Sequence, residues 1–199
     1  MELAEAPFSS LQLDALRDLA KVGAETAATA LSSLLGRPVE IDLARAAAPP
    51  VAEAVECCGP GDAVVTAIAV PAVGDLDALA LILMPAPTVH TLCELLGVDP
   101  DGDLGASALC EVGNILGSSY LGALAAMTRL QLWPGPPERV VDMAAAILAS
   151  AFLASGDGNT ALLLESRLSV AEAECSPAFL FIPSPAGLKR LFSRLGVAA

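Results

Sequence analysis

Two stretches of the chain carry apolar residues at the three- and four-residue spacing of a buried helix face. The first begins at Ser10 and stops before Gly36, which Arg37-Pro38 follows, and the second spans about Gly105 to Thr128. The pattern predicts two long amphipathic helices. The residues expected to face the core are Leu16, Leu19, Gly23, Ala27 and Leu34 in the first helix, and Leu109, Val112, Leu116, Tyr120, Ala123 and Met127 in the second.

Shorter aliphatic runs predict the strands. Residues 63–70 and 78–84 flank Val73-Gly74-Asp75 and predict an antiparallel pair with a short connection. Three further strands are expected at residues 39–43, 161–170 and 178–182. The Ala- and Pro-rich residues 46–61 predict a connection that contains a short helix.

Three shorter helices complete the pattern. They are expected at residues 88–96, before Gly97, at residues 141–154, after Pro134, Pro136 and Pro137, and at residues 185–195, before Gly196. Residues 99–103 read as a turn-rich linker, and the nearly nonpolar 141–154 helix is expected to be buried. Helices thus precede, separate and follow strand pairs, which favours an α/β (α+β) fold over a doubly wound parallel sheet.

The polar residues of the two long helices repeat at an offset of 93 positions. Leu31 and Leu124, and also Leu34 and Met127, share that offset. An internal duplication, with halves at about 10–100 and 101–199, is the simplest interpretation. Only the second half has a full polar set, because Asp14, Asp18 and Lys21 stand where Ser107, Glu111 and Asn114 stand in the second copy.

Winding the second helix at about 100° per residue puts Ser107, Glu111, Asn114 and Ser118 within roughly 60° of one another, away from the core. A solvated face is the usual explanation for such a stripe. The neighbouring Gly113 and Gly117 point further, because glycine inside a helix costs about 1 kcal/mol relative to alanine. They indicate either close approach of another backbone or tight packing against the protein's own sheet or a neighbouring helix.

Charge and composition limit the kinds of partner that the chain is expected to bind. The net charge is −13, with only ten Lys and Arg residues, which argues against nucleic acid, because phosphate binding needs clustered cations. An acidic surface suits a basic surface on a protein partner, and equally a soluble monomer. Apolar residues make up 55% of the chain and aromatic ones only 4%, so the expected core is built from Ala, Leu and Val.

Several chemistries are disfavoured. The five cysteines, at 57, 58, 93, 110 and 175, are odd in number and lack C-x-x-C spacing, so we expect reduced thiols and no metal site. The single His90 lies outside the helix that carries the polar stripe and completes no Ser-His or Cys-His pair. There is no glycine-rich phosphate loop, no signal-peptide pattern and no run of about 18 apolar residues, so we expect a cytoplasmic protein without a membrane span.

A carboxamide one turn from a carboxylate can still act on a partner's active site, since the amide orients water and the carboxylate binds a lysine. Residues 107–124, 141–143 and 181–185 closely resemble the CheC family of chemotaxis phosphatases, which includes CheX and FliY. Residues 22–24 and 27–31 extend the resemblance into the first half.

The resemblance implies a pseudo-two-fold duplicated fold of mostly antiparallel sheet, with two long site-bearing helices on one face. It implies hydrolysis of the aspartyl phosphate of a CheY-type response regulator. Asn114 would position the attacking water, Glu111 would hold the receiver's lysine, and Ser107 would have a supporting role. Mg²⁺ would be supplied by the receiver, the chain having no cofactor of its own. The Asp14, Asp18 and Lys21 face departs from the family's D/S-x-x-x-E-x-x-N motif in two places and is expected to be inactive.

Related possibilities stay open at this point. FliY adds a separate switch domain and CheX uses a shorter, single-site scaffold that dimerises, so length and the duplicated helix favour CheC. A non-catalytic adaptor that binds a receiver domain, or the deamidase CheD, is the alternative function. We expect a monomer.

Overall fold

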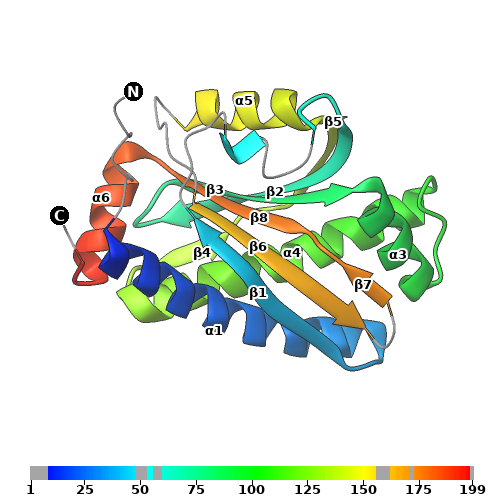
Figure 1. Cartoon of the computed structure of the whole chain (residues 1–199), viewed down its shortest axis with the longest axis horizontal. Coiled ribbons are helices and arrows are strands. Elements are labelled where there is room, and N and C mark those ends of the chain that lie inside the picture. The colour runs from blue at the N-terminus through cyan, green and yellow to red at the C-terminus, as the bar shows by residue number, and fades with distance from the viewer. Residues whose placement is uncertain (1–8, 48–52, 56–59, 156–161, 171–172, 198–199) are drawn as a thin grey trace.

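Two long antiparallel helices, α1 and α4, lie side by side on one face of a sheet, and α5 lies on the other face (Figure 1). The computed structural model describes residues 9–47, 53–55, 60–155, 162–170 and 173–197. The elements in chain order are α1 (Ser10–Leu35), β1 (Val39–Ala47), β2 (Val64–Gly74), β3 (Ala78–Pro85), α3 (Ala86–Leu96), α4 (Asp103–Thr128), β4 (Leu132–Pro134), β5 (Glu138–Met143), α5 (Ala144–Ala154), β6 (Leu162–Val170), β7 (Ala173–Cys175), β8 (Ala178–Pro183) and α6 (Pro185–Arg194).

Local signals set the ends of α1. The Ser9 hydroxyl accepts a bond from the Gln12 backbone N–H, and the Gln12 side chain accepts one from the Ser9 N–H at 2.8 Å, which forms a capping box. The Gln12 amide also donates to the Val197 carbonyl at 3.0 Å and so ties the start of α1 to the segment after α6. Gly36 ends the helix with φ of 63°, a left-handed conformation that glycine adopts without steric cost.

Every strand pair among the described residues is antiparallel, and the sheet order is β1-β6-β8-β3-β2-β4, with β5 also paired to β2 and β7 to β6. The order is symmetric when the two halves are exchanged. β1 of the first half lies beside β6 of the second, and β4 and β5 of the second half lie beside β2 of the first. An internal duplication with exchanged edge strands would produce this arrangement.

The sheet separates two apolar cores, because successive side chains of a strand point to opposite faces. On β3, Ala80, Ile82 and Met84 face α1 and α4, whereas Leu81 and Leu83 face α5. The same alternation holds on β2, β6 and β8. The expected fold of mixed helices and antiparallel sheet is therefore confirmed.

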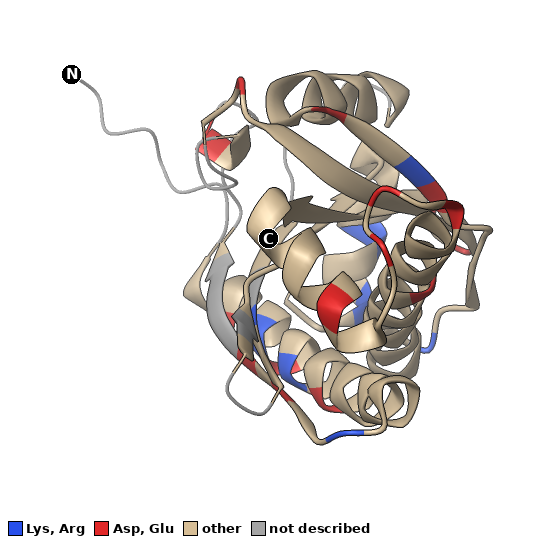
Figure 2. Ribbon diagram, turned by 90° about the vertical axis from the view of Figure 1, so that its right-hand side faces the viewer, with Lys and Arg blue, Asp and Glu red and all other residues tan. Residues whose placement is uncertain are grey.

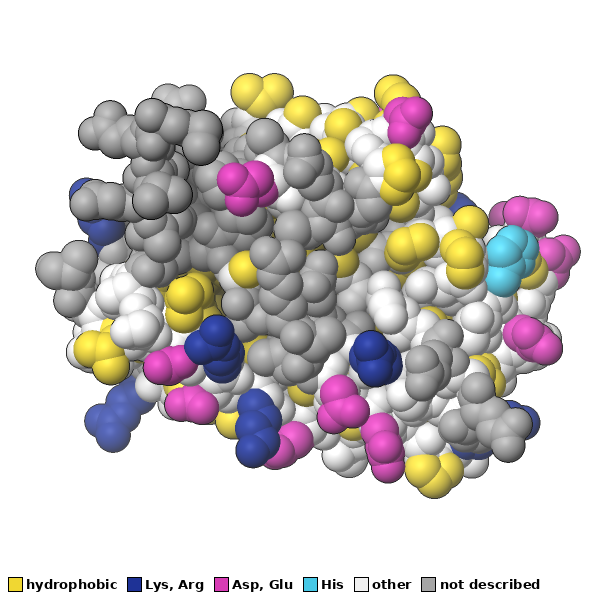
Figure 3. Space-filling model, viewed as in Figure 1, with side chains coloured by type: hydrophobic (Ala, Val, Ile, Leu, Met, Phe, Trp, Pro, Cys, Tyr) yellow, Lys and Arg dark blue, Asp and Glu magenta, His cyan; other side chains and the backbone are white. Residues whose placement is uncertain are grey.

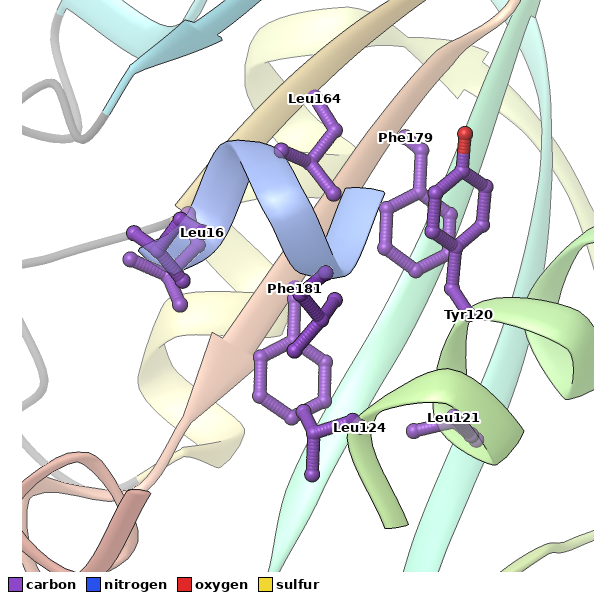
Figure 4. A pocket seen from close by; sticks show the side chains of 9 residues that line it. Leu16, Tyr120, Leu121, Leu124, Leu164, Phe179 and Phe181 are labelled. Atoms are coloured by element: carbon purple, nitrogen blue, oxygen red, sulfur yellow. The ribbon is translucent and has the colours of Figure 1, made fainter. Parts of the chain in front are cut away.

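Aromatic side chains fill the space between the two long helices and the sheet. The Tyr120 ring of α4 stacks on the Phe179 ring of β8 with the centroids 4.3 Å apart (Figure 4). A small apolar cavity of about 10 Å³ remains nearby, between Leu16, Leu124 and Phe181. This cavity has space for at most one water and none for a ligand.

The structure corrects the expected helix at residues 141–154. Val141, Asp142 and Met143 belong to β5, and helix α5 begins only at Ala144. The reason is a long-range pairing in which Val64 lies opposite Met143 and Val65 opposite Asp142. The short strands β4 and β7 were also not expected. The other predicted helices and strands lie within a few residues of their expected bounds.

Two residues expected to face the core are partly exposed. Leu34 and Met127 lie in the last turns of α1 and α4, with 38% and 37% of their surfaces exposed. The predicted connection at residues 46–61 falls mostly outside the described residues, although residues 53–55 form a helical turn. Cys57 and Cys58 lie outside them as well. Among the described helices, none is long and apolar enough to cross a bilayer.

Candidate functional site

The polar stripe of α4 faces outward, as the helical winding predicts. Ser107 and Glu111 are exposed, and Asn114 and Ser118 are half-buried. The opposite side of the helix carries Leu109, Val112 and Leu116, which are at least 97% buried against the sheet. The structure therefore brings Ser107, Glu111 and Asn114 together on one accessible helix face.

Glycines seat α4 on the sheet directly beneath this face. A Cβ on Gly113 would lie 2.5 Å from Cβ of Ile68, and one on Gly117 would lie 3.0 Å from Cγ2 of Val70. Both neighbours are side chains of β2. Packing against the protein's own sheet thus explains the two glycines, and approach by a foreign backbone is not needed. The backbone that carries Asn114 is consequently held against β2 from both sides of that residue.

The Asn114 carboxamide has a partner on its own helix. The Ser118 hydroxyl donates to Oδ1 of Asn114 at 3.3 Å. With respect to the described residues, one lone pair of Oδ1 and both N–H groups of the amide remain for a ligand, since a carboxamide offers two acceptor and two donor positions. The sequence places Ser118 on the stripe, but it does not reveal this bond.

The matching face of α1 has a different character. Asp14, Asp18 and Lys21 are all exposed, and Arg17 forms an ion pair with Asp14 at 2.6 Å. Within the described part of the chain, Lys21 forms no ion pair with Asp18 or Glu25. The face therefore presents a free ammonium group where α4 presents a carboxamide.

The two faces point toward opposite ends of the helix pair. Because α1 and α4 run antiparallel, with Gly23 against Tyr120, the N-terminal half of one helix lies beside the C-terminal half of the other (Figure 1). Glu111 and Asn114 lie in the N-terminal half of α4, and Asp18 and Lys21 lie in the N-terminal half of α1. The two faces are therefore displaced from each other along the helix pair.

An exposed leucine stands at the start of each face. Leu104, in the first turn of α4, is 70% exposed, and its counterpart Leu11, in the first turn of α1, is 68% exposed. Leu104 lies one turn before Ser107, on the same side of the helix. Leu104 lies outside the core-facing pattern of α4, and an apolar residue at such a position is the sequence signal that could have revealed it.

Charged side chains of both signs occur on the surface of the molecule (Figure 2 and Figure 3). Lys and Arg residues are spread over several separate elements (Figure 2). On the face seen in Figure 3, acidic and basic side chains are mixed along the lower edge, where α1 and β1 lie, and hydrophobic ones gather toward the upper right. The residues that the structure describes contain no group of three or more His, Cys, Asp or Glu residues placed to hold a metal ion.

Comparison with known proteins gives the family. Residues 104–141, which span the α4 stripe, match the CheC-like family. Over 199 residues the chain is 31% identical to the CheY-P phosphatase CheC of Bacillus subtilis, which covers 94% of this chain and 95% of that protein. The chain belongs to the CheC-like family. The resemblance read from the α4 motif is thereby confirmed at the level of the family.

Solved structures share the fold of this CheC-like chain. FliY of Thermotoga maritima superposes with a TM-score of 0.76 at 15% identity, covering 96% of this chain and 98% of that one. A chain of the FliM-SpeE complex from H. pylori gives a TM-score of 0.69 at 11% identity, covering 94% and 96%. At these identities the likeness concerns the fold alone.

Proposed function

We propose that this chain hydrolyses the aspartyl phosphate of a CheY-type response regulator in chemotaxis signalling, through one site formed by Glu111 and Asn114. The observation that carries the proposal is that both side chains stand one turn apart on an outward helix face that a second protein can reach. The activity named for the B. subtilis relative supports the substrate class.

Asn114 is proposed to position the attacking water. Its Oδ1 accepts a hydrogen bond from that water, and its Nδ2 donates to a phosphoryl oxygen. The water oxygen then forms a bond to phosphorus while the bond between phosphorus and the aspartyl oxygen breaks, and the protons of the water leave with the released inorganic phosphate. An aspartate carboxylate leaves without help from an acid, because its pKa of about 3.9 makes it a stable anion at neutral pH. Positioning of water is therefore the main contribution required of this chain.

Glu111 is proposed to fix the docked pose. Its exposed carboxylate can bind the receiver's lysine through a charge-assisted hydrogen bond, which is stronger than a neutral one. Ser107 is given only a supporting role at the start of the motif. Mg²⁺ belongs to the receiver in this proposal, and no group of this chain is assigned to bind it.

The α1 face is proposed to be inactive. Lys21 has only donors, so it cannot accept a hydrogen bond from water as the Asn114 carbonyl can. Asp18 is also one methylene shorter than Glu111, which shortens its reach toward a partner's lysine. The monomeric state, a CheD partner and the cytoplasmic location stay predictions from the sequence.

The decisive experiment measures dephosphorylation of a CheY-type receiver from the same organism. The receiver is phosphorylated with a small phosphodonor, the donor is removed, and the decay is followed with wild-type protein, with Asn114→Ala and with Lys21→Ala. Lys21 is the matched control because it occupies the position of Asn114 in the other helix. We expect acceleration by wild type and by Lys21→Ala, and none by Asn114→Ala.

The other outcomes are equally informative. Full activity of Asn114→Ala would overturn the water-positioning role. No acceleration by any variant, together with binding of the receiver in a titration, would replace the phosphatase by the adaptor. Folding of each variant is checked by its unfolding transition, which should hardly change, because an outward helix position accepts alanine well.

A further inference from the structure

Several hydroxyl groups on the two long helices donate to the backbone of their own helix. Thr26, Thr29 and Ser33 each donate to the backbone carbonyl four residues earlier in α1. Ser32 of α1 and Thr128 of α4 do the same, at 2.7 and 2.6 Å. A hydrogen bond to the carbonyl four residues earlier is the usual arrangement of a Ser or Thr hydroxyl inside a helix. Ser118 donates instead to the side chain four residues earlier, Oδ1 of Asn114.

We propose that Ser118 is a positioning residue that holds the Asn114 carboxamide in the orientation that binds the attacking water. The inference rests on the proposed function of Asn114. It adds that the active unit of α4 is a pair, Asn114 with Ser118, and not the asparagine alone.

The packing around Asn114 makes the bond from Ser118 the main restraint on the orientation of the carboxamide. Gly113 and Gly117 press the helix backbone onto Ile68 and Val70, so the Cα of Asn114 has little freedom to move. What remains free is rotation about the χ1 and χ2 bonds of the half-buried side chain. A bond from Ser118 to Oδ1 turns the carbonyl toward the C-terminal end of α4 and leaves Nδ2 on the other side. The carbonyl oxygen and the N–H groups of the amide thus point in different, fixed directions before a receiver binds.

The inactive face lacks the same pair. The counterparts of Asn114 and Ser118 at the 93-residue offset are Lys21 and Glu25, both exposed. Lys21 has no amide that a neighbour could orient, and the Glu25 carboxylate cannot donate a hydrogen bond. The chain thus has either both members of the pair, on α4, or neither, on α1.

The test compares two isosteric variants that differ in the hydroxyl. Ser118→Thr keeps the donor and Ser118→Val replaces it by a methyl group. We expect Ser118→Val to lower kcat about tenfold through misplacement of the amide, with KM for the phosphorylated receiver unchanged. Ser118→Thr should retain most of the wild-type kcat. Ser193→Ala, at an exposed serine of α6, serves as the control and should change neither constant.

A second readout needs no receiver. Three-bond couplings from NMR report whether χ1 of Asn114 occupies one rotamer or averages over several. We expect one rotamer in wild type and in Ser118→Thr, and averaging in Ser118→Val. Averaging already in the wild-type protein, or equal kcat for the Thr and Val variants, would overturn the positioning role.

The failures of the two proposals are distinguishable. If Asn114→Ala keeps full activity, the proposed function of that residue fails whatever Ser118 does. If Asn114→Ala is inactive while Ser118→Val has the kcat of wild type, only the positioning role of Ser118 fails.

Discussion

Gly23 of α1 lies directly against the ring of Tyr120 of α4, with no room for a side chain between them. The same ring stacks on Phe179 of β8, so Tyr120 contacts both α1 and the sheet. This contact fixes the position of α1 relative to α4. It therefore also fixes the relative positions of the two proposed faces, which lie on the outer sides of these helices. The glycine is required here for space, and it sits in the middle of a helix, where glycine is otherwise unfavourable.

We expect Gly23→Ala to destabilise the protein. Its new methyl group would overlap Cδ1 of Tyr120, and overpacking of this kind costs about 1–3 kcal/mol. Urea unfolding measures the change as a lower midpoint. Gly122→Ala is the matched control in α4, because a Cβ there meets no atom within 4 Å. Its helix propensity should raise the free energy of unfolding by about 0.5–1 kcal/mol. A shift of the same sign in both variants would contradict the assignment.

A second prediction concerns restoring the α1 face. In an Asn114→Ala background, the combined changes Asp18→Glu, Lys21→Asn and Glu25→Ser rebuild on α1 the residues that α4 carries at the same positions. We expect part of the phosphatase activity to return, because the exposed α1 face then has the acceptor and the donors of a carboxamide. The variant without Glu25→Ser should recover less. No recovery in the receiver assay would show that the α1 face lacks more than these groups.

Leu104 is expected to contribute to receiver binding and not to the chemical step. Its 70% exposed side chain lies on the site face, where a docked protein would bury it. Leu104→Ala should therefore raise KM about fivefold, which corresponds to about 1 kcal/mol of lost apolar burial, while kcat stays the same. Leu11→Ala, at the matching position of α1, is the control and should leave both constants unchanged. Equal effects of the two variants would place the receiver elsewhere.

Stability should fall above pH 9 because of Cys175. Burial raises the pKa of this thiol from 9.0 to about 11, and the side chain is only 5% exposed. As the pH rises from 9 to 11, the unfolded chain loses the proton first, so the contribution of the neutral thiol to stability is lost, by about 3 kcal/mol. Urea unfolding of wild type and Cys175→Ala across this range isolates the effect. Parallel curves for the two proteins would contradict it.

The sequence sufficed where the structure depends on local signals. The long helices follow from the period of Leu16, Leu19 and Gly23 and from the glycine at position 36, and both act within a few residues of chain. Strand β5 was missed because its pairing with β2 joins residues far apart in the sequence. All six of its residues are exposed, so it lacks the alternation that reveals a strand. Its Val141, Asp142 and Met143 were assigned instead to the start of the following helix.

The candidate site was likewise predictable from the sequence only in part. Helical winding alone placed Glu111 and Asn114 outward, and the structure has them there. The rotamer of Asn114 and its bond to Ser118 depend on side-chain packing, which no spacing rule reports. The role of Gly113 was likewise open until Ile68 was found beneath it.

The exchange of edge strands makes each half of the chain indispensable to the other. Without β1, strand β6 would expose the backbone N–H and C=O groups that β1 now pairs, and an open apolar edge invites aggregation. Without α1, the ring of Tyr120 and the sheet beneath it would meet solvent. Substitutions on the exposed α1 face therefore cost the fold little, whereas deletion of the first half would also unfold the second half, which carries the proposed site. The α1 face that we propose to be inactive would then be retained because its helix supports the α4 face that we propose to be active.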